Sequence, residues 1–437
     1  MRKQCMKWAV SAVLLPAAMG LVACSESGGD AESGNGGGGV GKYTVESSKQ
    51  KLEDAATELM DNLSASNFQE VTDLAKYIRD TYGDYDASAV DNWYKGCLDD
   101  ITTVLSHTSV GNSTSNTYKR IYQAGIFTGH FTAQNDRWTY TAANDLQFIV
   151  KDQNGQLCVL KLVTSGATVR IYVGDETEYK GAYNGYTYTS TSEKYENYVE
   201  VPQNIVVTAT QGAKELASVT VTTSLTVSGE KPSPVTDKFD VTVSTKLSSG
   251  YAVDVKRAFF NGGADAGLEF VAKKNDKTLV SANVKGKTRF TSNGDGDYEL
   301  QSGSVDNLEV DILGKVQVKG TCSDVKGVIE DMENADDNDR DEAAYKRYIA
   351  NVNARVNLGL YFDKTSTKQA TLRLEPFYKE RQDYYNGGVY LKWGSNAILE
   401  FADGTSYGVE EYFNEDRFGD VVKRFEQLLR DFEDMVK

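Results

Sequence analysis

Histidine is nearly absent from this chain, since 437 residues include only His107 and His130. A hydrolytic triad needs a histidine beside a nucleophile and an acid, and the sequence contains no nucleophile elbow. It also contains no HExxH, no paired CxxC and no phosphate-binding loop. We therefore predict no catalytic residue, no cofactor and no metal site, and we expect both histidines to be structural or surface residues.

Cysteine is scarce as well, which argues against a disulfide framework. Beyond residue 24 only Cys97, Cys158 and Cys322 remain, an odd number. Each has apolar or small neighbours, so we expect buried free thiols, although one disulfide among them is possible. A catalytic cysteine is disfavoured because it would need a nearby base.

Basic residues are outnumbered by acidic ones, 47 to 63, giving a net charge of −16. Removal of residues 1–23 takes away three basic residues and no acidic one, which changes the net charge to −19. Phosphate binding requires a basic face, so we exclude nucleic acid as a partner. The same charge argues against a body that lies flat on an anionic membrane.

The first 24 residues have a defined order. A basic start is followed by an apolar run over residues 8–23 that is too short and interrupted to be a permanent membrane span. The run ends in Leu21-Val22-Ala23-Cys24, which resembles the lipobox of a bacterial lipoprotein signal. This resemblance implies a signal peptide at 1–23, lipid on Cys24 and attachment to the membrane through that lipid. The alternative is an ordinary signal peptide that is cut elsewhere.

A polar, flexible segment follows over residues 24–41. It consists almost entirely of Ser, Gly, Asn, Ala and acids, and such a composition cannot bury apolar surface. About 17 residues of this kind give an r.m.s. reach of roughly 20–25 Å. The Ser-Glu after Cys24 resembles the export tag of surface lipoproteins in Bacteroidetes. We therefore expect an outer-membrane lipoprotein, with the cell surface favoured over the periplasmic face.

Residues 42–112 have helical periodicity. Apolar residues recur at three- and four-residue steps in three successive stretches, the third of which includes Trp93. We expect three amphipathic helices whose narrow apolar stripes pack on each other or on the following segment. These residues are interpreted as core.

From 113 to 437 the period changes to two, which is typical of strands. The runs include Arg137–Thr141, Leu146–Val150, Leu157–Val163 and Thr168–Val173, with further runs up to Ala397–Phe401. A helical pattern recurs after Glu342, and the chain ends in a long amphipathic helix from Phe418 to Met435. We predict an antiparallel β-rich body with this helix packed on it, which could be continuous with 42–112.

Three blocks of seventeen residues align without a gap: Leu146–Leu162, Ile205–Val221 and Leu268–Val284. Each contains an apolar strand, a polar turn, a leucine at the twelfth position and a second strand. This recurrence suggests a broad antiparallel meander of repeated hairpins. Convergent hairpin chemistry would produce the same similarity.

One interval is rich in tyrosine. Because the phenol ring is apolar and its hydroxyl is hydrated, exposed tyrosines can bind sugar or peptide. The alternative is a hairpin whose rings pack across strands. The candidate ligand surface comprises Tyr179, Tyr183, Tyr186, Tyr188, Tyr195 and Tyr198.

Two acidic clusters could supply oxygen ligands to calcium. One contains Asn293, Asp295 and Asp297, and the other spans Asp336–Asp341. Neither has the glycine and distal glutamate of a helix-loop-helix calcium motif, so we favour solvated charge.

Several segments together resemble a group of uncharacterised lipoproteins of gut Bacteroidales. They are Tyr82-Gly83-Asp84-Tyr85, Ser366–Ala370, Phe401–Tyr407 and Glu410-Glu411-Tyr412-Phe413, together with the hairpin blocks. The resemblance covers most of the mature chain. It implies export and lipidation, and it brings no activity, ligand or catalytic residue.

The sequence thus predicts an α+β protein: N-terminal helices, a large antiparallel sheet or open barrel, and a C-terminal helix packed on it. Its function is expected to be non-enzymatic binding or a structural role at the outer membrane. One alternative is a carrier of lipid or another apolar ligand, with a groove under the C-terminal helix. Another is an accessory protein that binds or hydrolyses glycan, since a pair of acids would suffice for hydrolysis. The ligand could be glycan, lipid or protein.

Overall fold

The computed structural model describes residues 43–82, 108–111, 117–123, 128–183, 188–229, 231–292, 298–382, 389–412 and 415–436. They fall into two compact units. Unit 1 combines Met1–Ala65 with Gly263–Asp434, and unit 2 comprises Ser66–Gly262 with Met435–Lys437. The division places the first two N-terminal helices in different units, whereas the sequence grouped them in one segment, 42–112.

The helices of unit 1 begin with α2, whose N-cap Thr44 accepts a hydrogen bond from the Ser47 N–H. The others are α5, α6, the short α7 and the C-terminal α8. Their bounds are α2 Val45–Asn62, α5 Val325–Asp337, α6 Glu342–Arg355, α7 Val409–Tyr412 and α8 Glu415–Val436. Unit 2 contains α3, Gln69–Tyr82, and a short 3₁₀ turn, Ala65–Asn67, lies between α2 and α3.

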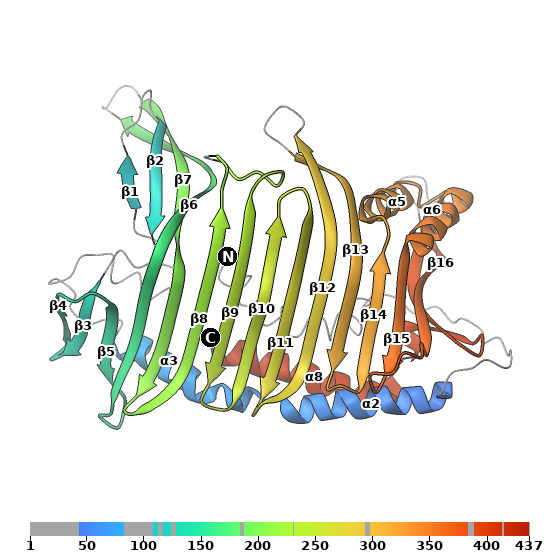
Figure 1. Cartoon of the computed structure of the whole chain (residues 1–437), viewed down its shortest axis with the longest axis horizontal. Helices are drawn as coiled ribbons and strands as arrows, with labels where there is room; N and C mark the ends of the chain where they lie inside the picture. The colour runs from blue at the N-terminus through green and yellow to red at the C-terminus, as the bar shows by residue number, and fades with distance from the viewer. Residues whose placement is uncertain are drawn as a thin grey trace. The chain divides into compact units, whose positions relative to one another are not determined.

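The strands of unit 1 form an antiparallel meander in which each strand pairs with the next one in sequence. Figure 1 shows this succession from β11 to β16. The strands are β11 Asp265–Lys274, β12 Lys277–Ser292, β13 Tyr298–Ile312, β14 Val316–Cys322, β15 Val356–Phe362, β16 Ala370–Gln382, β17 Val389–Phe401 and β18 Ser406–Gly408.

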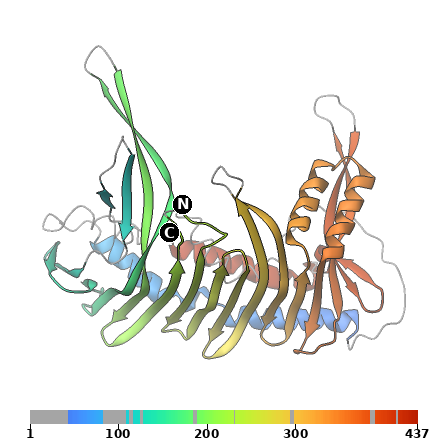
Figure 2. The same ribbon diagram turned by 45° about the horizontal axis from the view of Figure 1, so that its top comes forward.

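Unit 2 is also mostly antiparallel, from β5 through β10, but it contains two parallel pairs, β3 with β5 and β2 with β7. Its strands are β1 Thr108–Gly111, β2 Thr117–Gln123, β3 Gly129–Gln134, β4 Arg137–Thr141, β5 Leu146–Lys151, β6 Leu157–Tyr183, β7 Tyr188–Gln211, β8 Lys214–Thr226, β9 Lys238–Leu247 and β10 Tyr251–Asn261. The long strands β6 and β7 continue together beyond the end of β8, where β2 first pairs with β7 and the two strands then extend alone as a ribbon (Figure 2).

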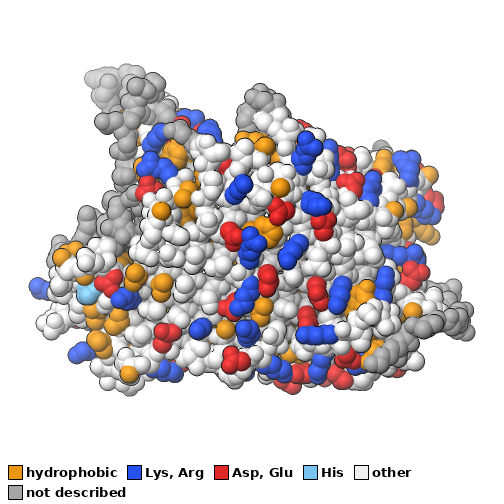
Figure 3. All heavy atoms as spheres, in the orientation of Figure 1, with side chains coloured by type: hydrophobic (Ala, Val, Ile, Leu, Met, Phe, Trp, Pro, Cys, Tyr) orange, Lys and Arg blue, Asp and Glu red, His pale blue; other side chains and the backbone are white. Residues whose placement is uncertain are grey.

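Strand alternation gives the sheet of unit 1 one apolar and one polar face. A row of directly paired residues crosses seven strands on the apolar face: Phe270, Ala282, Val310, Val318, Leu360, Ala370 and Phe401. The neighbouring row on the opposite face is mainly polar: Glu269, Asn283, Glu309, Lys319, Gly359, Thr371 and Glu400. Acidic and basic side chains are interspersed over the face of the molecule seen in Figure 3. In the polar row of unit 1, Lys319 forms an ion pair with Glu309.

All three seventeen-residue blocks are hairpins whose first and last residues pair: Leu146 with Leu162, Ile205 with Val221, and Leu268 with Val284. The second and third blocks also share a bulge near the turn. The twelfth-position leucines differ, because Leu216 and Leu279 are 0% and 1% exposed whereas Leu157 is 49% exposed. A common origin of the blocks remains a prediction.

In each unit a glutamate of an N-terminal helix binds the turns of two neighbouring hairpins. Glu70 of α3 accepts hydrogen bonds from Lys214 (2.5 Å) and Ser248 (2.7 Å), which belong to the β7–β8 and β9–β10 turns. In unit 1, Glu58 of α2 accepts from Lys277 (2.5 Å) in the β11–β12 turn and from Lys315 in the β13–β14 turn. Lys214 and Lys277 hold the same position, the tenth, in their blocks.

Nearer the start of α2, Lys51 and Tyr43, which precedes the helix, both contact Asp363 in the β15–β16 connection. On α3, the Tyr82 hydroxyl donates to the Lys151 carbonyl at the β5–β6 turn, at 2.5 Å. Hairpin turns at one end of each sheet are therefore joined to a helix by side-chain contacts, so each helix helps to fix the order and spacing of the hairpins.

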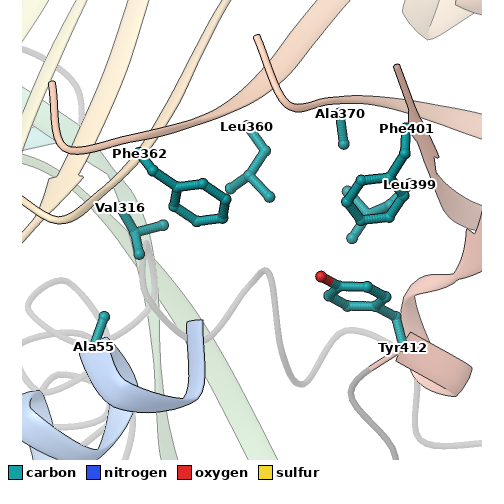
Figure 4. Packing of buried hydrophobic residues seen from close by; sticks show 8 residues of the cluster. All are labelled: Ala55, Val316, Leu360, Phe362, Ala370, Leu399, Phe401 and Tyr412. Atoms are coloured by element: carbon teal, nitrogen blue, oxygen red, sulfur yellow. The ribbon is translucent and has the colours of Figure 1, made fainter. Parts of the chain in front are cut away.

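The main core of unit 1 lies between α2, α7 and the strands β14–β17. Figure 4 shows how the rings of Phe362, Phe401 and Tyr412 approach the aliphatic side chains there. The cluster comprises Ala55, Val316, Leu360, Phe362, Ala370, Leu399, Phe401 and Tyr412. A second cluster packs α5 and α6 on β17 through Tyr345, Ile349 and Trp393. In unit 2 the fully buried Trp138 packs with Tyr82, Phe131 and Phe148.

The coarse fold prediction is confirmed: strands make up 58% of the chain, helices accompany them, and the sheet is mostly antiparallel and not closed. The sequence did not predict α5 as a helix, and it predicted β6 as two strands. The third N-terminal helix, with Trp93 and Cys97, lies outside the described residues. None of the helices in the described ranges combines the length and apolar content that crossing a bilayer requires.

Candidate functional site

Several predicted functional residues lie outside the described ranges. They are the lipidation site Cys24 with its polar tether, His107, the cluster of Asn293, Asp295 and Asp297, and Tyr186. Lipidation of Cys24 therefore stays a prediction from the sequence.

The tyrosine-rich interval does not form one exposed surface. Tyr179 is 78% exposed, but Tyr195 and Tyr198 are 7% and 2% exposed. Tyr183 and Tyr188 pair with each other at the outer end of the β6–β7 ribbon. Tyr195 and Tyr198 therefore cannot belong to a solvent-facing ligand surface, and among the tyrosines whose side chains are described only Tyr179 fits that prediction.

The parallel strand β2 explains why two of these tyrosines are buried. It places Tyr118 against Tyr195, with stacked rings 5.4 Å apart, and Arg120 lies 3.9 Å from the centroid of the same ring. Arg120 also forms ion pairs with Glu176 and Glu178 of β6. This contact depends on strands more than seventy residues apart, so periodicity in the tyrosine interval alone could not indicate it.

A second network lies on the β6–β7 ribbon around Asp175. The Tyr172 hydroxyl donates to Asp175 at 2.6 Å, and Lys194 forms an ion pair with the same carboxylate at 2.7 Å. The hydrogen bond to this carboxylate raises the pKa of Tyr172 to about 12, and Lys194 lowers the pKa of Asp175. Both groups keep their ordinary charge at neutral pH, so the network is a stable set of fixed charges.

His130 belongs to an ion-pair cluster in unit 2. Its Nε2 lies 2.8 Å from Asp145 Oδ1, and Lys161 Nζ lies 2.8 Å from Asp145 Oδ2. The Gln147 amide donates to the same Oδ2 at 2.9 Å. Lys161, followed by Gln147 and His130, holds the pKa of Asp145 well below its usual range. The Asp145 carboxylate thus contacts three side chains. These contacts fix the positions of polar side chains on the surface of the sheet.

The acidic stretch Asp336–Asp341 spans the α5–α6 connection, and its residues stabilise that connection through specific contacts. Asp339 pairs with Lys392 at 2.9 Å, and its carbonyl accepts the Trp393 N–H. Asp341 caps α6 by accepting the Ala344 N–H. Within the part of the chain that the structure describes, no group of three or more His, Cys, Asp or Glu residues is arranged to hold a metal ion.

The described cysteines are free thiols. Cys158 is buried, and burial raises the pKa of its thiol, which opposes nucleophilic reactivity. Cys322 is half-buried in β14. The described tryptophans are also buried, since Trp138 and Trp393 are 0% and 7% exposed. Neither indole offers a face on which a sugar could stack.

The feature that sequence reasoning missed is the outer edge of β6. This strand pairs with β7 from Cys158 to Tyr183, but with β5 only from Leu157 to Leu162. Among the described residues, no strand pairs with that second edge beyond Leu162. A strand edge of this kind presents unpaired N–H and C=O groups to which another strand can bind.

Two bulges divide the β6 edge. The first lies between Ser165 and Thr168, where Gly166 has φ +84°, and the second follows Tyr172. A Cβ at Gly166 would lie 2.6 Å from the Gln203 side chain, so glycine is required at this bend. The sequence contains Gly166 and Gly174 at these positions, but its pattern predicted two separate strands, Leu157–Val163 and Thr168–Val173.

Comparison of the chain with protein-family models, with curated proteins and with solved structures yields no match.

Proposed function

We propose that this protein is an exported lipoprotein, anchored to the outer membrane through lipid on Cys24, whose body performs non-enzymatic binding. The lipobox and the polar tether that follows it support the anchor. A lipid group with several acyl chains would hold a soluble body at a bilayer, whereas a single chain binds only marginally. The Ser-Glu after Cys24 supports display at the cell surface.

The open edge of β6 is the observation that most supports a binding role. Extended peptides and strands bind such edges through main-chain hydrogen bonds, and side chains on alternate residues give specificity. The carboxylates of Asp145 and Glu58, in contrast, each already bind two or more side chains within their own unit. The proposal is therefore recognition through strand addition.

The described interiors favour this role over the two alternatives. A carrier needs an apolar groove, and the core between α2, α7 and β14–β17 does not offer one, because side chains pack together there (Figure 4). A glycan-binding accessory needs exposed aromatic faces, and both described tryptophans are buried.

The anchor is tested by separating membranes from soluble fractions of cells that express the wild-type chain or Cys24→Ala. We expect the wild type in the outer-membrane fraction, sensitive to protease added to intact cells. We expect Cys24→Ala to lose acylation and membrane retention. Cys322→Ala is the matched control and should behave as the wild type. Equal membrane retention of Cys24→Ala would refute the lipid anchor, and protease resistance in intact cells would refute surface display.

A further inference from the structure

The strand β6 has an open edge whose charges complement each other when two copies of the chain are placed side by side. Arg170 is half-exposed and pairs with Glu200 at 2.5 Å. Asp175, five residues further along the same strand, pairs with Lys194 at 2.7 Å and is partly exposed. Between them lies Val173, a large apolar side chain that is 57% exposed.

The backbone orientation follows from the register with β7. The Gly212 N–H donates to the Leu157 carbonyl at 2.7 Å, which shows that even-numbered residues of β7 turn their backbone groups toward β6. Ile171 and Gly174 pair with odd-numbered residues, Val199 and Asn197. Their N–H and C=O groups therefore point to the open edge.

The bulge at Val173 makes an antiparallel self-pairing possible. Arg170 and Asp175 pair with Glu200 and Glu196, which share a face because they are four residues apart on a regular strand. Arg170 and Asp175 therefore share a face as well. In the register that places Arg170 opposite Asp175 of a second copy, Ile171 lies opposite Gly174, and both have outward-facing backbone groups.

Resting on the strand addition proposed above for this edge, we propose that the added strand is β6 of a second copy, so that the two edges pair antiparallel about a two-fold axis beside Val173. In this register a row of alternating charge crosses the interface. It consists of Glu200 and Arg170 of one copy, followed by Asp175 and Lys194 of the second copy. No acid of β6 faces an acid of the second copy: Glu176 lies opposite Val169, and Glu178 opposite Ala167. Shifting the register by two residues in either direction removes Arg170 from its acidic partner.

Val173 provides the most direct test, because the two-fold axis passes between residues 172 and 173. Each Val173 then lies opposite Tyr172 of the second copy, with the two Val173 side chains next to each other across the axis. Its exposure means that substitution leaves the fold of the single chain intact. We expect mature lipidated protein in detergent to show a concentration-dependent dimer by sedimentation and native mass spectrometry. Val173→Asp and Val173→Lys should each weaken self-association by at least about tenfold, because like charges meet at the axis.

Mixing the two variants gives a result that only this geometry predicts. Val173→Asp and Val173→Lys in equal amounts should form a mixed dimer, since opposite charges then meet at the axis. Val389→Asp is the matched control, because Val389 is 65% exposed on β17, and it should dimerise as the wild type does. In the wild type, hydrogen exchange at Ile171 and Gly174 should slow as protein concentration rises.

Three outcomes would overturn the proposal. They are a wild type that is monomeric at all concentrations, a dimer that tolerates both substitutions at position 173, and mixing that restores nothing. A photo-crosslinking residue at position 173 that captures only a different protein in intact cells would overturn the homodimer while agreeing with strand addition at this edge. All variants keep the same lipid, so association through the anchor would not respond to position 173, and this test can fail independently of the anchor.

Discussion

The twelfth-position leucines of the three hairpin blocks show how one sequence feature can occupy different environments. Leu216 and Leu279 are buried, whereas Leu157 is half-exposed. Alternation predicted the strand in each case, but it could not predict how much of the sheet a neighbouring helix covers. Periodicity thus identifies a strand and its two faces, and burial depends on contacts that are distant in sequence.

This difference gives a matched stability series. Leu216→Ala and Leu279→Ala should each lower the free energy of unfolding by about 2–5 kcal/mol, because they remove buried methyl groups and leave a cavity. Leu157→Ala should change it by less than about 0.5–1 kcal/mol. Urea unfolding followed by circular dichroism measures all three, and equal losses at the three positions would contradict the burial described here.

Glu58 and Glu70 make stability depend on pH. The pKa of Glu58 is lowered chiefly by Lys277 and then Lys315, and that of Glu70 chiefly by Lys214. A lowered folded-state pKa means that the stabilisation is present above the unfolded value of 4.5 and is lost as pH falls through the folded value. Because these pairs are partly exposed, the whole effect should be modest.

We therefore expect the wild type to lose unfolding free energy as pH falls from about 5 to 3. The double variant Glu58→Gln, Glu70→Gln should be less stable at pH 7 and should lose less over that range. Glu215→Gln, at an exposed position of β8, serves as the control and should follow the wild-type curve. Identical slopes for the double variant and the wild type would show that these two glutamates do not contribute.

Among the elements, the helices α2 and α3 have the clearest structural role, since each contacts successive hairpin turns of its own unit. The sequence indicated amphipathic helices but gave no indication that charged residues on them would bind the turns. The tenth-position lysines, Lys214 and Lys277, were visible as shared residues of two blocks. Their partners could not be identified, because helix and turn lie more than 140 residues apart.

Removing one lysine should loosen one helix at a time. Lys214→Met should speed hydrogen exchange in α3 and the β7–β8 turn, because it deletes an ion pair to Glu70. Lys277→Met should do the same for α2 and the β11–β12 turn. Each variant is the control for the other. Faster exchange in both helices from a single substitution would mean that the contacts are not local to a unit.

The helix α5 was not predicted because acidic residues dominate the second half of its sequence, and these were interpreted as solvated charge. In the structure Asp331 binds Arg355 of α6, and Asp324 caps the helix start. Charge in this segment is therefore neutralised by a residue of the following helix. Composition alone could not distinguish a paired acidic helix from an acidic loop.

For the whole molecule, the sequence predicts where in the cell the protein is located, and the structure identifies the strand edge that is proposed to bind. The lipobox, tether and net charge concern export and solubility, and they can be inferred without a fold. The open edge of β6 required the strand pairings, since only they show where β5 ends and β6 continues. Together they support the proposal of an anchored body that binds through its backbone edge.

Mass spectrometry of the N-terminal peptide from native envelopes tests the central claim most directly. The account predicts a mature chain that begins at Cys24 and has the added mass of a lipid group on that cysteine. An unmodified thiol at position 24, or a chain that retains residues 1–23, would contradict it.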